Sequence, residues 1–107
     1  MELTQVSQKI GEKIEELEGF KKTLPLLAQE KAETMAMYER AMASETVTLI
    51  PNHAISVIEK IARGRCADLR CKADLAESAY KNCLKIIDIT EAQLNGYQSI
   101  NRYLSET

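Results

Sequence analysis

Apolar residues recur every three or four positions through most of the chain, which is the spacing of one face of an α-helix. In the second half this pattern continues for over five heptads without a slip, and only Thr90 and Asn101 in it are clearly polar. It predicts one long amphipathic helix. Its apolar seam consists of Cys66, Leu69, Ala73, Ala76, Tyr80, Cys83, Ile87, Thr90, Leu94, Tyr97, Asn101 and Leu104.

The first half has a similar seam, but Pro25 interrupts it. A proline inside a helix removes a backbone donor and clashes with the preceding turn. Either the helix kinks near residues 21–24, or a new helix starts with Pro25 in its first turn. The predicted seam consists of Ile10, Ile14, Leu17, Lys21, Leu24, Ala28, Lys31, Met35, Tyr38 and Met42.

Between the two halves, the stretch ETVTLIPN predicts a turn. Thr46, Val47, Thr48 and Ile50 are β-branched and form helix poorly, and Pro51 disfavours a helical conformation at the residue before it. We expect the helix to resume after Asn52, a good N-cap, or after Ser56, which has capping-box spacing to Glu59. Gly64 is a candidate break before the long helix.

The chain is therefore predicted to be all-α, with residues 1–107 forming a single antiparallel helical hairpin. One arm covers roughly residues 2–45 and is broken near Pro25, and the other covers roughly residues 53–105. Each arm would be about 60 Å long or more if straight. Two helices alone bury little core, so we expect hairpins to associate into a multi-helix bundle, as a homodimer or a larger assembly.

The composition indicates a helix-rich protein of the cytoplasm. No apolar stretch approaches the length of about 20 residues that spans a membrane, and the N-terminus has no hydrophobic signal-peptide core. Three cysteines fit a reducing compartment. The net charge of −2 argues against DNA binding by the whole surface, although a local basic patch leaves direct DNA binding open.

No catalytic or metal-binding motif stands out. The cysteines are spaced C-x4-C-x11-C, which differs from zinc sites, and two of them lie on the predicted seam as small apolar residues. His53 is the sole histidine and lies in the turn, so no cysteine has a base beside it. Glu15, Glu16 and Glu18 read as a solvated helix face. We expect no enzymatic activity, metal or cofactor.

A basic cluster is the one local anomaly. Five positive charges fall within 13 residues, opposed there only by Asp68. These charges either keep the surface soluble by pairing with the acidic first arm, or they bind phosphate or an acidic protein face. Because the cluster follows the turn that holds Asn52 and His53, we predict a ligand or partner site at this end. The site residues would be Asn52, His53, Lys60, Arg63, Arg65 and Arg70, with Lys72 beside them.

Roughly residues 46–103 resemble small helical proteins from the early or recombination regions of tailed phages of Gram-positive bacteria. The similarity lies in a Thr-Leu-Ile turn, an Ala-Arg-Gly step, an Asp-Ala-Glu run with a following Tyr and Lys, and a coiled-coil tail. The segment HAISVIEKI is longer than the corresponding part of that pattern. The matching positions are Thr48, Leu49, Ile50, Ala62, Arg63, Gly64, Leu69, Arg70, Asp74, Ala76, Glu77, Tyr80 and Lys81.

The resemblance implies a phage protein acting in the host cytoplasm. Two functions remain open. The first is a non-enzymatic binding protein that inhibits host defence by binding or sequestering a protein partner or an anionic nucleotide signal. The second is a structural accessory in a phage DNA recombination or replication complex.

Overall fold

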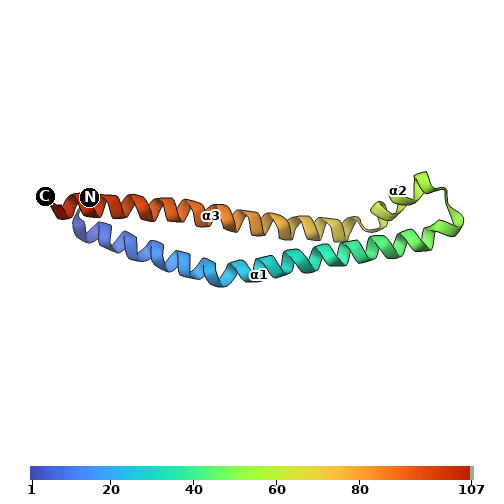
Figure 1. The fold of residues 1–107 in the computed structure, drawn as a ribbon, viewed down its shortest axis with the longest axis horizontal. Coiled ribbons are helices and arrows are strands. Elements are labelled where there is room, and N and C mark those ends of the chain that lie inside the picture. Colours follow the sequence, from blue (N-terminus) through green and yellow to red (C-terminus); the bar gives the residue numbers. More distant parts are fainter. Residues whose placement is uncertain (107) are drawn as a thin grey trace. The chain divides into compact units, whose positions relative to one another are not determined.

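The computed structural model describes residues 1–106 and is all-α, as predicted (Figure 1). The elements follow in the order α1 (Leu3–Leu49), a single 3-10 turn η1 (Ile50–Asn52), α2 (Ile55–Arg65) and α3 (Ala67–Glu106). Two compact units are formed. One consists of Met1–Leu26 with the part of α3 from Lys81 onward, and the other is Leu27–Tyr80. In each unit, segments of α1 and α3 run in opposite directions (Figure 1).

Helix α1 passes through Pro25 without ending, so no second helix begins there. Proline cannot donate to the carbonyl of Lys21 four residues earlier, which removes one hydrogen bond from the helix. Nearby, the Thr23 hydroxyl donates to the Gly19 carbonyl at 3.1 Å. The boundary between the two units falls directly after Leu26, next to this missing bond.

The turn between α1 and α2 comes later than expected from the β-branched residues Thr46, Val47 and Thr48, because α1 continues through them to Leu49. The hydroxyls of Thr46 and Thr48 donate to the carbonyls of Met42 and Ser44, at 2.7 and 2.9 Å, inside the helix. Leu49 is buried in a small core, which draws the last turn of α1 inward. His53 Nδ1 then lies 3.3 Å from the Leu49 carbonyl oxygen and satisfies one of the acceptors that a helix end leaves open.

The predicted start and break of α2 were wrong by a few residues. The N-cap is Ala54, with no side-chain cap, rather than Asn52 or Ser56. The Ala54 carbonyl accepts the backbone N–H groups of Val57 and Ile58 directly. The break falls at Cys66 instead of Gly64, since the buried Cys66 side chain ties the chain to the core at that point.

The seam predicted for the second half is confirmed at every position, because all twelve residues, Cys66 before α3 and eleven within it, are buried or half-buried. In α1 the seam is partly shifted by one residue. Ile14 and Lys21 are exposed, while Lys13 and Phe20 are half-buried. Both patterns are heptads, but the predicted one steps by four and then three from Ile10, whereas the packed face steps by three and then four. Lys13 is accommodated because its amine reaches Glu16 at 3.3 Å.

Candidate anion-binding site

Within the unit Leu27–Tyr80, one surface hollow of about 430 Å³ combines two arginines with an aromatic ring. Tyr38 comes from α1, Arg63 from α2, and Ala67 and Arg70 from α3. The break at Cys66 separates α2 from α3, so that Arg63 and Arg70 approach the hollow from different helices. The small side chain of Ala67 leaves the space between them open.

Arg70 contacts both an aromatic ring and a carboxylate. Its guanidinium carbon lies 5.2 Å from the centroid of the Tyr38 ring, within the range of a cation–π contact. Its Nε lies 3.2 Å from a carboxylate oxygen of Asp74. Hydrogen bonding to Tyr38 and the charge of Asp74 raise the pKa of Arg70 above its usual value, so the side chain stays charged.

The other arginines also have carboxylate partners. Arg63 pairs with Glu59 at 2.6 Å on α2, and Arg65 pairs with Glu45 of α1 at 2.9 Å. The prediction that cluster charges pair with the first arm is therefore met by Arg65. The Arg63–Glu59 and Arg70–Asp74 pairs are solvent-exposed, and such ion pairs contribute about 0–1 kcal/mol each. An incoming anion can therefore compete with Glu59 or Asp74 for the guanidinium groups.

Of the six predicted site residues, the structure brings Arg63 and Arg70 together at the hollow. Asn52, Lys60 and Arg65 are exposed elsewhere on the same unit, and His53 is engaged with the end of α1. Tyr38 was placed on the seam by the sequence pattern and was not predicted as a site residue. Counting the antiparallel register outward from the turn at Ile50–Asn52 would have placed Tyr38 opposite Gly64 and not Arg70, so the sequence carried no direct signal for this contact.

The cysteines follow the sequence interpretation, since Cys66 and Cys83 are buried and Cys71 is exposed. Among residues 1–106, no three His, Cys, Asp or Glu side chains are grouped closely enough to hold a metal ion.

This burial predicts selective thiol chemistry. Under native conditions, Cys71 is expected to react with iodoacetamide at least about tenfold faster than Cys66 or Cys83, because a thiolate must be exposed to react. Peptide mass spectrometry of timed samples measures the three rates, and the same reaction in urea should make them similar. Equal rates in the native protein would contradict the burial of the two seam cysteines.

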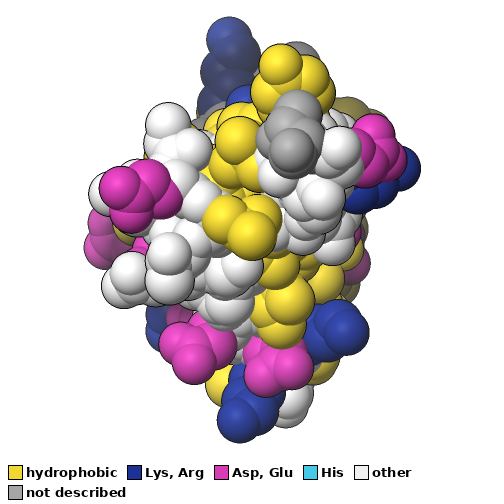
Figure 2. All heavy atoms as spheres, turned by 90° about the vertical axis from the view of Figure 1, so that its left-hand side faces the viewer, with side chains coloured by type: hydrophobic (Ala, Val, Ile, Leu, Met, Phe, Trp, Pro, Cys, Tyr) yellow, Lys and Arg dark blue, Asp and Glu magenta, His cyan; other side chains and the backbone are white. Residues whose placement is uncertain are grey.

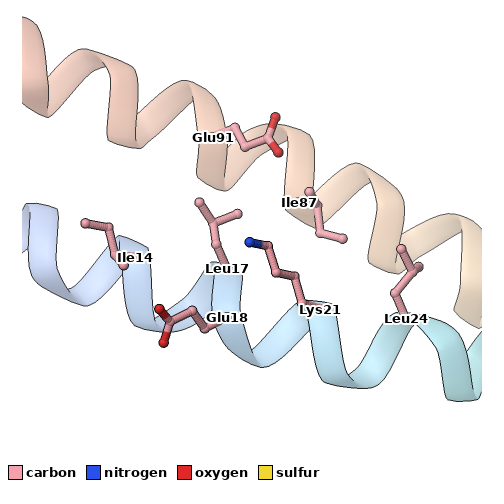
Figure 3. Close-up of a pocket in the computed structure, with 7 residues that line it drawn as sticks. All are labelled: Ile14, Leu17, Glu18, Lys21, Leu24, Ile87 and Glu91. Carbon is pink, nitrogen blue, oxygen red and sulfur yellow. The ribbon is translucent and has the colours of Figure 1, made fainter.

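The other unit contains a groove of a different character. It is lined mainly by apolar side chains of α1 and α3, and Leu17 and Ile87 each point toward the opposite helix (Figure 3). Lys21, Glu18 and Glu91 bring one positive and two negative charges to it. The lining of the groove therefore carries more negative than positive charge, whereas the charged side chains that line the Tyr38–Arg63–Arg70 hollow are both arginines.

No protein-family model, curated protein or solved structure matches the chain. Over the part of the chain that the structure describes, no helix has the length and apolar character needed to cross a bilayer.

Proposed function

We propose that this chain is a non-enzymatic binding protein that takes a phosphate group of a nucleotide in the Tyr38–Arg63–Arg70 hollow. The observation that supports this is the convergence of two guanidinium groups from different helices around one aromatic-lined hollow. Guanidinium forks match phosphate oxygens in pairs, and an aromatic ring can contact a nucleobase. A volume of about 430 Å³ lies within the range of small-ligand sites.

The chemistry of the lining favours binding over turnover. Of the described side chains, those that line the hollow include no histidine, carboxylate or cysteine, which are the usual general bases and nucleophiles. Bound nucleotide would be held and withdrawn from solution. With the resemblance to phage helical proteins, we propose sequestration of an anionic signal of host defence in the host cytoplasm. An acidic protein face could use the same guanidinium groups, and nucleotide titration separates these two targets.

Titration calorimetry with cyclic dinucleotides, cyclic ADP-ribose and inorganic phosphate tests the proposal. Arg70→Gln and Arg63→Gln are each expected to weaken nucleotide binding by about tenfold to a hundredfold, because each removes a charge-assisted hydrogen bond. Arg40→Gln is the matched control, since Arg40 is an exposed arginine of the same unit that does not line the hollow. Affinity should also fall as salt rises from about 0.05 to 0.2 M.

Circular dichroism should first establish that the variants keep the helical content of the unmodified chain. If folded Arg63→Gln and Arg70→Gln variants bind as tightly as the Arg40→Gln control, or if no nucleotide binds, the hollow is not a nucleotide site.

A second candidate function, a structural accessory in a phage DNA recombination or replication complex, is favoured by a different observation. Large apolar side chains such as Leu75, Ile89 and Tyr103 are exposed on α3, and assembly proteins cover such residues with partners. Sedimentation of the chain with and without single-stranded DNA tests this alternative. Co-sedimentation that survives Arg63→Gln and Arg70→Gln would favour it.

A further inference from the structure

In the unit that contains both termini, α3 carries a second apolar face beside its seam. Figure 2, which faces the left-hand end of Figure 1, shows that hydrophobic side chains also reach the surface at that end of the molecule. On α3, the exposed fractions are 46% for Ile86, 57% for Ile89, 41% for Ile100 and 69% for Tyr103. Two exposed residues between them complete the heptad spacing of three and four. The α3 stripe thus consists of Ile86, Ile89, Gln93, Gly96, Ile100 and Tyr103.

We infer that the α3 stripe is the interface of a homodimer in which two copies of α3 pack antiparallel about a two-fold axis. The order of residue types reads the same in both directions from the midpoint between Leu94 and Asn95. Along the α3 stripe, two large apolar residues are followed by two polar or small residues and then by two more large apolar residues. A two-fold interface requires such self-complementarity, because if one residue contacts a second, the second contacts the first.

This arrangement gives each stripe residue a suitable neighbour over a contact about 26 Å long. Large apolar residues face each other at both ends. At the centre, Gln93 faces Gly96, where an added Cβ would meet no atom of the same chain within 4 Å, so there is room for the amide. The two Gln93 amides near the axis can donate to and accept from each other. The pairs across the axis are Ile86 with Tyr103, Ile89 with Ile100, and Gln93 with Gly96.

The charges beside the stripe favour the antiparallel direction. One flank of the stripe repeats every seven residues. It consists of Lys85, Ala92, Ser99 and Glu106. In the antiparallel dimer, Lys85 of each copy lies near Glu106 of the other copy, so the two-fold axis generates two such pairs of opposite charge. Small residues, Ala92 and Ser99, meet between them. In a parallel dimer, Lys85 would instead lie beside Thr90 of the second copy, so the two opposite charges would not meet.

Sedimentation equilibrium of the full chain, at concentrations of about 1–100 µM, tests the inference. The unmodified chain is expected to form dimers. Ile89→Asp should weaken association by at least about a hundredfold, because the charge enters the interface twice. Val47→Asp is the matched control, since Val47 is 68% exposed on α1 in the other unit, and it should leave the dimer unchanged.

The direction of packing is tested by a charge exchange. Lys85→Glu and Glu106→Lys should each weaken the dimer several-fold, and the double variant should restore it. Both positions are exposed, so the variants are expected to fold as the unmodified chain does. The inference would be overturned if the unmodified chain stayed monomeric at about 100 µM. It would also be overturned if Ile89→Asp left the dimer unaffected, or if the single charge variants tightened association. Nucleotide binding at the Tyr38–Arg63–Arg70 hollow is measured separately and does not enter this test.

Discussion

Replacing Ala73 by Asp is expected to unfold the unit Leu27–Tyr80. Ala73 is 1% exposed on the seam of α3, where its small side chain lets the helices approach closely. An aspartate there is both too large and too short to bring its carboxylate to water. A buried, unpaired charge costs several kcal/mol, and overpacking adds about 1–3 kcal/mol. The sum is comparable with the whole stability of a small domain, about 5–15 kcal/mol.

Thermal melting, followed by the circular dichroism of the helices, measures this loss of stability. Ala43→Asp is the matched control, because Ala43 is an exposed alanine on α1 of the same unit. It should change stability by no more than about 0.5 kcal/mol. An Ala73→Asp variant that melts with the control would show that the two helices do not pack closely at this position.

Leu49→Ala is expected to release α2 from the rest of its unit. Leu49 is buried in a core with Ile58 and Ala62, against which Met42 and Ile61 also pack. Truncating a buried leucine to alanine costs about 2–5 kcal/mol. Helix α2 has 11 residues, and isolated helices shorter than about 12–15 residues are marginal in water. Once its core contact is weakened, α2 should therefore open locally while α3 remains helical.

Amide hydrogen exchange resolves this local effect. The amides of α2 should exchange at least about tenfold faster in Leu49→Ala than in the unmodified chain, whereas those of α3 beyond Lys81 should change little. Val47→Ala serves as the control, since Val47 lies two residues away and is exposed. Unchanged exchange in α2 would mean that Leu49 does not anchor it, and uniform acceleration along the chain would mean that the chain opens as one cooperative unit.

The separation in sequence between Tyr38 and the two arginines explains why only part of the candidate site could be predicted from the sequence. Arg63 and Arg70 stand out as part of a local excess of positive charge. Tyr38 lies 32 residues before Arg70, and in the sequence it cannot be told from the other residues of the apolar seam. The charge cluster also suggested more than the structure brings together. Lys60, Arg63 and Arg65 share one short helix, and only Arg63 lines the hollow.

The sequence by itself determined the helical class and the packed face of α3, because side chains three and four residues apart share a helix face whatever surrounds them. It also determined that the chain reverses near Pro51. Only the tertiary structure decided where α1 ends, since the threonine hydroxyls bond within the helix and Leu49 is held by Ile58 and Ala62. It alone decided that Ala54 and Cys66 bound α2, because those limits depend on which side chains become buried. The meeting of Tyr38, Arg63 and Arg70 likewise depends on the register between helices, which no local pattern encodes.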